Sequence, residues 1–172
     1  MDELRLPLRT RSAGDTRAVG AAIGSLLRPG DAIALAGDLG AGKTTLVQGL
    51  ASALGYAGHV ASPTFTLVRE YAASLRLRHV DVYRLERVQD VLDLGLDDDP
   101  DAVVAVEWGD AVEGLLPTDH LTIDLRTEDD AGADAPVDAE VRRIALRAPR
   151  SSTWAARWDE LALRTDAWRD AR

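Results

Sequence analysis

The chain contains the stretch Gly37-Asp38-Leu39-Gly40-Ala41-Gly42-Lys43-Thr44, which is followed by Thr45. This stretch matches G-x-x-x-x-G-K-[ST], the pattern of a phosphate-binding loop (P-loop), at every fixed position. Residues 32–36 before it form an unbroken apolar run, typical of a strand buried on both faces of a parallel sheet. Residues 42–54 after it carry leucines at helical spacing. The order of strand, glycine-rich turn and helix predicts an α/β fold, with a P-loop NTPase-like mixed sheet and flanking helices.

The residue types of the loop fit phosphate binding. Glycines at 37, 40 and 42 allow positive φ, so that backbone N–H groups turn inward, and the helix N-terminus adds about half a positive charge. Lys43 is the only lysine of the chain, and the loop needs its compact charge because the broad arginine fork does not fit. We therefore expect residues 37–45 to bind a nucleotide, with Lys43 on the outer phosphates and the Thr44 hydroxyl on Mg²⁺.

Composition limits the class of protein. The 172 residues fit one domain, with a core at about 12–148 and a tryptophan-bearing helix at about 152–168. The sequence shows no long apolar run, no N-terminal signal and no cysteine, which favours a cytoplasmic protein without a membrane segment or disulfides. The net charge of −9 disfavours direct binding to a nucleic-acid backbone, so we expect any role with RNA to depend on a partner protein.

Alternation of apolar and polar residues predicts further strands. Residues 65–71 and 75–84 are expected to form an added antiparallel hairpin, and residues 120–126 and 141–148 to pair with each other. The acidic stretch 127–140 between the latter two is predicted to be a mobile loop. In the C-terminal helix, tryptophans recur at helical spacing, which favours a packing role.

Two carboxylates are candidates for the chemistry. Glu107 directly follows the apolar run 102–106, where a Walker B acid that binds Mg²⁺ would stand, and Asp81 ends another predicted strand. Either acid could instead be satisfied by solvent or by a neighbouring arginine. Thr64 and Thr66 lie where a nucleotide-sensing loop would follow the P-loop helix, but they could equally be plain strand residues.

Residue types and motifs that are absent from the sequence narrow the range of ligands expected at the site. His59 and His79 have no metal-ligand companions at suitable spacing, so we expect them in loops or on strand surfaces. The chain has no asparagine and no second lysine, and so lacks the Asn-Lys-x-Asp motif on which guanine specificity depends. The expected nucleotide is therefore ATP.

Four blocks of sequence carry a family resemblance. They are residues 37–45 with Gly49, Ser-Pro-Thr-Phe-Thr-Leu at 62–67, His-Val-Asp-Val-Tyr-Arg-Leu at 79–85, and Val-Glu-Trp at 106–108. Together they resemble the signatures of the bacterial TsaE family, the small ATPase of tRNA threonylcarbamoyladenosine (t6A) biosynthesis. The similarity runs from about residue 16 to residue 148.

The resemblance implies a weak, Mg²⁺-dependent ATPase that binds the heterodimer of the TsaB and TsaD proteins. That pair transfers threonylcarbamoyl to tRNA, while the ATPase drives repeated turnover and does not itself transfer the group. Carried over to this chain, Lys43 and the loop amides bind phosphates, Thr44 and Glu107 bind Mg²⁺, and Asp81 assists hydrolysis. Trp108 would couple the nucleotide state to the partner. Gly109 departs from the family, whose members often have Pro or Ala there.

Two other functions are compatible with a P-loop. A small-molecule kinase would suit the size of the chain, but its lid-sized loop at 127–140 is acidic and contains no arginine, which disfavours transfer to an acidic acceptor. A nucleotide-binding adaptor without useful hydrolysis is disfavoured because both Asp81 and Glu107 are present.

Overall fold

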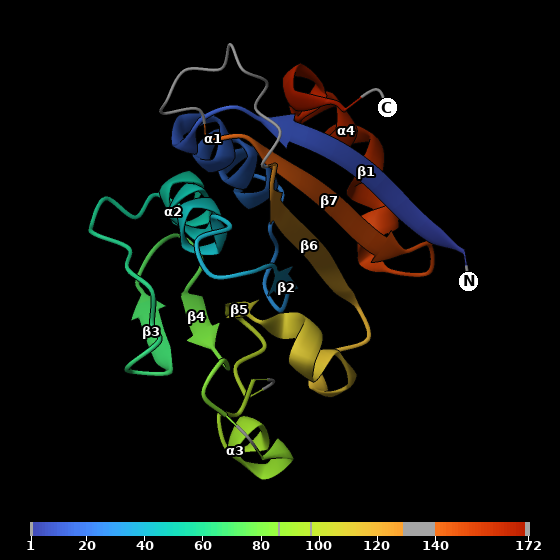
Figure 1. Cartoon of the computed structure of the whole chain (residues 1–172). Coiled ribbons are helices and arrows are strands. Elements are labelled where there is room, and N and C mark those ends of the chain that lie inside the picture. The colour runs from blue at the N-terminus through green and yellow to red at the C-terminus, as the bar shows by residue number, and fades with distance from the viewer. Residues whose placement is uncertain (1, 86, 97, 129–139, 171–172) are drawn as a thin grey trace.

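One mixed sheet organises the molecule in the computed structural model, which describes residues 2–85, 87–96, 98–128 and 140–170. The sheet is seven-stranded with the order β1-β7-β6-β2-β5-β4-β3 (Figure 1). The strands are β1 (Glu3–Thr10), β2 (Ala32–Ala36), β3 (Val68–Tyr71), β4 (Leu77–Asp81), β5 (Val103–Glu107), β6 (His120–Thr127) and β7 (Arg142–Pro149). The mixed α/β architecture predicted from the sequence is confirmed.

The parallel centre of the sheet positions the loop of interest. β2 pairs in parallel with both β5 and β6, and β4 pairs in parallel with β5. Every residue of β2 and β5 is buried, as their apolar sequences predict, because both sheet faces are covered. The carboxyl ends of these strands therefore meet at one edge, where α/β proteins bind ligands.

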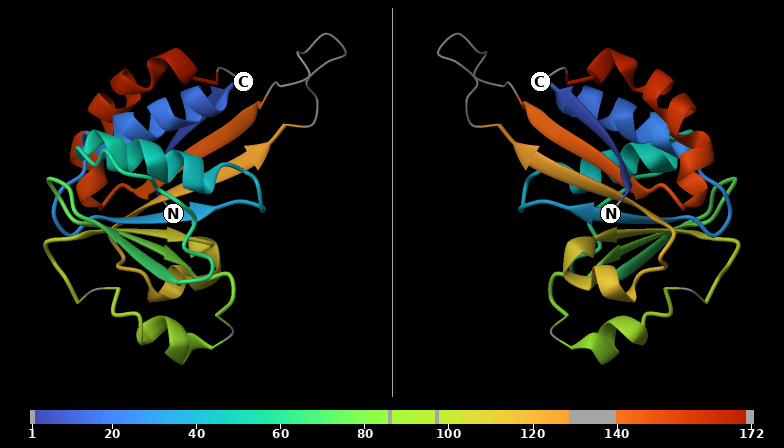
Figure 2. Two further views of the ribbon diagram at one scale, coloured as in Figure 1. Left: turned by 90° about the vertical axis from the view of Figure 1, so that its left-hand side faces the viewer. Right: turned by 90° about the vertical axis from the view of Figure 1, so that its right-hand side faces the viewer.

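Helices cover both faces of the sheet. They are α1 (Ala13–Gly24), α2 (Lys43–Ala53), α3 (Val88–Leu92), α4 (Trp158–Arg164) and the 3₁₀ helices η1 (Gly109–Leu115), η2 (Thr153–Arg157) and η3 (Asp166–Trp168). Seen edge-on in Figure 2, α1, α2 and the C-terminal helices lie on one face, and α3 and η1 lie on the other. None of the helices in the described ranges is long and apolar enough to cross a membrane.

Glycines let α1 and α2 approach closely. A Cβ on Gly49 of α2 would collide with the Arg17 carbonyl, and a Cβ on Gly20 of α1 would collide with the Leu46 carbonyl. Ser12 caps α1 by accepting a hydrogen bond from the Asp15 amide at 3.0 Å. The close pair of helices fixes α2, whose first residue is Lys43.

The predicted hairpin forms, but both strands are shorter than expected, since the second, predicted over residues 75–84, spans only Leu77–Asp81. β3 and β4 pair antiparallel, whereas residues 64–66 form a turn and Leu67 adopts a φ of 64°. The Leu67 amide donates to the Pro63 carbonyl at 2.7 Å, and this turn leaves Phe65 84% exposed. The expectation that residues 65–67 belong to the strand is therefore wrong, because the amides of Thr66 and Leu67 bond to Pro63 within the turn, and only the Leu67 carbonyl still accepts from β4, from the Asp81 amide at 2.9 Å.

The two late strands pair as predicted. β6 and β7 are antiparallel, with Leu125 opposite Ile144. The predicted mobile loop between them falls largely at 129–139, outside the described residues.

The C-terminal segment differs from the single helix predicted over 152–168. It consists of η2, α4 and η3, and its first break coincides with Arg157, whose guanidinium is bound by the buried Asp31 carboxylate at 2.6 and 3.0 Å. Trp154 is fully buried. The Arg157 Cζ atom lies over the Trp154 ring, 3.9 Å from the ring centroid. The predicted packing role of the tryptophans is confirmed for Trp154 and Trp158, which belong to the core.

Arg169 and Asp170 lie along the outer edge of the sheet. Arg169 forms an isolated antiparallel bridge with Leu8 of β1, and the Asp170 amide donates to the Pro7 carbonyl at 3.0 Å. The C-terminal residues thus lie against the outermost strand.

Candidate functional site

The glycine-rich loop joins the carboxyl end of β2 to the N-terminus of α2. Its three glycines at 37, 40 and 42 have φ values of 136°, 80° and 105°, a region that side chains with a Cβ rarely adopt. A Cβ on Gly37 would also collide with the Leu125 carbonyl. The loop conformation therefore requires the glycines that the sequence places there.

The remaining loop residues predicted to bind the nucleotide differ in their exposure to solvent. Ala41 is buried, Thr45 is half-buried, Asp38 is exposed, and Leu39 projects from the loop with 91% of its surface exposed. A hollow of about 250 Å³ lies beside the loop. Its lining comprises Ala36, Gly37, Asp38, Trp108, Asp124, Leu125 and Arg126.

Lys43 is buried at the mouth of the loop, with 4% of its surface exposed. Its Nζ donates to the carbonyl oxygens of Gly37 at 2.6 Å and Asp38 at 2.9 Å. The same ammonium lies 4.1 Å from the centroid of the Trp108 ring, a favourable cation–π geometry. The lysine is thus held across the loop, close to the residue that follows Glu107.

Glu107, the last residue of β5, meets Thr44 at the start of α2. The Thr44 hydroxyl donates to Glu107 Oε1 at 2.7 Å, and Glu107 is 4% exposed. Burial raises the pKa of the Glu107 carboxyl, but hydrogen bonds from His79 and Thr44 and the nearby Lys43 charge outweigh it, so this pKa lies below its ordinary value. The side chain is therefore a carboxylate at neutral pH, and it is joined to Thr44 rather than to solvent or an arginine.

His79 is a site residue that the sequence reasoning missed. We expected a loop or a strand surface, but the side chain is completely buried on β4, and its Nε2 lies 2.8 Å from Glu107 Oε1. That expectation was wrong because β4 lies inside the sheet, between β5 and β3, so its alternate residues face the core. The only sequence signal was its position two residues before Asp81.

Asp81 ends β4 directly opposite Glu107 in the parallel register of β4 and β5. It is buried, and its carboxylate accepts a hydrogen bond from the Thr64 hydroxyl at 2.9 Å and another from the Tyr83 amide at 2.8 Å. The Thr66 hydroxyl instead donates to the Pro63 carbonyl at 3.4 Å. Of the two threonines left open by the sequence, Thr64 lies at the site and Thr66 supports the turn.

Aromatic side chains border the site. Trp108 has a positive φ of 62° and packs against Tyr83, with ring centroids 4.8 Å apart. Such a backbone conformation is sterically costly outside glycine, and the structure places it next to Glu107. Gly109 follows, and any Cβ there would lie 2.8 Å from the Ala34 methyl carbon, so this glycine allows the chain to pass close to β2.

Arg142 of β7 forms hydrogen bonds to the glycine-rich loop. Its guanidinium donates to the carbonyl oxygens of Ala41 at 3.0 Å and Gly40 at 3.3 Å. These bonds tie two backbone carbonyls of the loop to strand β7. The sequence did not predict this contact, because about a hundred residues separate the partners and nothing in the local pattern marks it.

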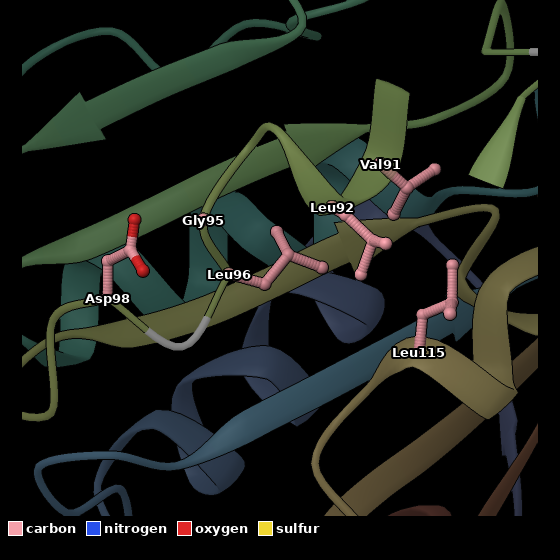
Figure 3. Close-up of a pocket in the computed structure, with 6 residues that line it drawn as sticks. All are labelled: Val91, Leu92, Gly95, Leu96, Asp98 and Leu115. Carbon is pink, nitrogen blue, oxygen red and sulfur yellow. The ribbon is translucent and has the colours of Figure 1, made fainter. Parts of the chain in front are cut away.

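A second hollow lies on the opposite sheet face, between α3 and η1 (Figure 3). It measures about 180 Å³ and is lined by Val91, Leu92, Gly95, Leu96, Asp98 and Leu115. None of the residues predicted for the site lines it. The polar groups that the sequence singled out converge instead at the phosphate loop.

Fold and loop together define the class, an α/β protein with a P-loop-like fold. The model of the family described as "Threonylcarbamoyl adenosine biosynthesis protein TsaE" matches residues 10–135. The chain is 42% identical over 130 residues to the tRNA threonylcarbamoyladenosine biosynthesis protein TsaE of Treponema pallidum, covering 74% of this chain and 96% of the relative. It is 41% identical over 129 residues to its Bacillus subtilis namesake, covering 73% and 80%.

A solved structure agrees with these sequence matches. The crystal structure of Bacillus subtilis YdiB superposes with a TM-score of 0.71 at 29% identity, covering 97% of each chain. The chain belongs to the TsaE family. The resemblance drawn from the four sequence blocks is thereby confirmed.

Proposed function

We propose that this chain is a Mg²⁺-dependent ATPase that serves the t6A modification of tRNA. The family and the names of its relatives support the pathway. The observation that carries the chemistry is the contact of Thr44 with Glu107 at the N-terminus of α2, beside the phosphate loop. A hydroxyl and a carboxylate in this position are what a nucleotide-bound magnesium ion needs from a P-loop protein.

The loop would bind the phosphates of ATP. The positive φ values of Gly37, Gly40 and Gly42 would let backbone amides of the loop turn toward phosphate oxygens, and the start of α2 would add partial positive charge. Lys43 would exchange its carbonyl contacts for phosphate oxygens, which are stronger acceptors because they are charged. Arg142 would keep the loop in this shape.

Thr44 and Glu107 would hold Mg²⁺. No cluster of three or more His, Cys, Asp or Glu side chains suited to a metal occurs within the described ranges. That fits magnesium, which commonly uses one or two protein ligands together with substrate phosphates and water. The ion would neutralise charge that develops on the phosphates.

Asp81 would assist hydrolysis. Its carboxylate is held in place by the Thr64 hydroxyl and the Tyr83 amide, next to Glu107 on the adjacent strand. A carboxylate fixed in this way can orient a water molecule and accept its proton. Because Thr64 lies on the segment that follows α2, the position of that segment would control whether Asp81 is correctly oriented.

The chain would act through the TsaB–TsaD protein pair, meet tRNA only indirectly, and not transfer the threonylcarbamoyl group itself. Its net charge of −9 supports a protein rather than an RNA partner. Exposed aromatic side chains beside the site, Phe65 and Tyr83, offer a surface of the kind that protein interfaces use.

ATP hydrolysis and t6A formation test the proposal together. We expect slow hydrolysis by the chain alone, faster hydrolysis with a TsaB–TsaD pair, and repeated rounds of t6A formation only when chain, pair and ATP are all present. Fast hydrolysis by the chain alone that depends on a small-molecule acceptor would identify a kinase instead. Multiple rounds of modification without the chain would refute its role.

A further inference from the structure

His79 stands out among the buried polar side chains. It is completely buried, and of its two ring nitrogens Nε2 contacts Glu107. Nδ1 is buried without a hydrogen-bond partner among the described residues. An unsatisfied buried polar atom costs free energy, and a leucine of similar volume would avoid that cost. The contact with Glu107 therefore needs a reason other than packing.

We propose that His79 is a positioning residue, which donates a hydrogen bond from Nε2 to Glu107 Oε1 and so orients that carboxylate for magnesium. The proposal rests on the ATPase function proposed above. The direction of the hydrogen bond follows from the acceptor, because a carboxylate oxygen has no hydrogen to give, so Nε2 must carry the hydrogen of this contact.

Both partners of Glu107 use the same oxygen. Thr44 reaches Oε1 at 2.7 Å from α2, and His79 reaches it at 2.8 Å from the adjacent strand β4. A threonine hydroxyl that gives an oxygen lone pair to a cation can still donate its hydrogen to Oε1. The hydrogen bond from His79 would therefore hold Glu107 together with Thr44, from an element that carries no proposed magnesium ligand.

The surroundings of His79 make it a rigid support. Its β4 backbone pairs with β5 on one side and β3 on the other, and the Tyr71 ring lies 6.3 Å away, centroid to centroid. Tyr71 in turn donates its hydroxyl hydrogen to the Ala61 carbonyl at 3.2 Å. Side chains that orient a metal ligand in this way typically change metal affinity about 10- to 100-fold when removed.

Three substitutions separate positioning from packing. His79→Leu keeps the volume and removes the donor. His79→Gln places an N–H close to the position of Nε2 and should restore the bond to Glu107. His79→Asn places its N–H near the position of Nδ1, and should not restore it. His59→Gln is a control, because His59 is exposed.

The measurement is binding of Mn²⁺ to the full chain in the presence of ADP, followed by electron paramagnetic resonance. We expect His79→Leu and His79→Asn to weaken Mn²⁺ binding about 10- to 100-fold, and His79→Gln and His59→Gln to bind nearly as the wild type does. ADP affinity in EDTA and the melting temperature without metal should change little in all four variants.

Two results would overturn the inference while leaving the proposed function intact. One is wild-type Mn²⁺ affinity in His79→Leu. The other is that all three His79 variants lose Mn²⁺ affinity to the same extent and all three melt at a lower temperature, which would make the residue purely structural. If the wild-type chain itself binds no nucleotide, the proposed function fails, and this inference fails with it.

Discussion

The contacts of Lys43 make the sharpest prediction at the level of single residues. The ammonium is buried against two loop carbonyls and the Trp108 ring, and Lys43 is the only basic residue of the loop 37–45. Lys43→Ala should reduce ATP affinity at least about 100-fold, since several charge-assisted hydrogen bonds are lost. Lys43→Arg should fail as well, because the planar fork is too broad. Isothermal titration measures both, and retained ATP affinity at an unchanged melting temperature would contradict the loop assignment.

Asp81 should separate binding from catalysis. Asp81→Asn keeps the shape of the side chain, because its amide oxygen can accept from the Tyr83 amide while its NH2 group donates to the Thr64 hydroxyl, but it removes the basic carboxylate. We expect ATP affinity to stay within a few-fold of the wild type and hydrolysis to slow by about 10²- to 10⁴-fold. Single-turnover hydrolysis measures the effect. Asp93→Asn, at an exposed acid on the far face, is the control.

At the scale of elements, strand β7 supports the phosphate loop through one residue. Arg142→Ala removes the two hydrogen bonds to the loop carbonyls and should lower ATP affinity about 10-fold, because the loop must be ordered on binding. The neighbouring Arg143 is exposed and pairs with Glu128, so Arg143→Ala should leave the affinity unchanged. Equal effects of the two variants would show that ATP affinity depends on net charge rather than on the hydrogen bonds from Arg142 to the loop.

The packing of α1 on α2 predicts opposite outcomes for two helical glycines. Gly49→Ala places a methyl group against the Arg17 carbonyl and should destabilise the fold by about 1–3 kcal/mol. Gly14 lies in the first turn of α1, where a Cβ would meet only the Ser12 hydroxyl at 3.5 Å. Gly14→Ala should therefore be neutral or stabilise by up to about 1 kcal/mol. Urea denaturation of both variants is the measurement, and a neutral Gly49→Ala would mean that the helices can separate at no cost.

The sequence predicted those features that adjacent residues determine. They are the glycine-rich loop, the buried strands β2 and β5, and the acids at the ends of strands. The roles of His79 and Arg142 could not be predicted, because they depend on which strands become neighbours and in what register. The break of the C-terminal helix is of the same kind, since it coincides with a distant partner, Asp31, that binds Arg157.

For the molecule as a whole, we propose that residues 1–172 unfold as one domain. The C-terminal segment contributes Trp154 and Trp158 to the same core that α1 and α2 build, and the Arg157–Asp31 pair joins it to the start of β2. Tryptophan fluorescence and far-ultraviolet circular dichroism should therefore report one coincident transition. Separate transitions would show that the segment is an appendage.

The same pair gives a prediction for overall stability. Arg157→Met leaves the buried Asp31 carboxylate without its counter-charge and should lower the free energy of unfolding by about 3–5 kcal/mol. Arg164→Met breaks an exposed pair with Glu160 and should cost no more than about 0.5 kcal/mol. A loss confined to the C-terminal segment, with the rest of the fold unchanged, would contradict cooperative unfolding.

The placement of the C-terminal residues against β1 has a consequence for self-association. An uncovered outer strand exposes unpaired backbone groups to which a strand of another molecule can add. Here the bridge from Arg169 and the amide of Asp170 occupy the backbone at Pro7 and Leu8, and Pro7 itself has no amide hydrogen to offer. The opposite margin, β3, is only four residues long and carries Arg69 and Glu70. Edge-to-edge pairing is thus opposed at both margins of the sheet, at Pro7 and Leu8 of β1 by Arg169 and Asp170 and at β3 by short length and charge.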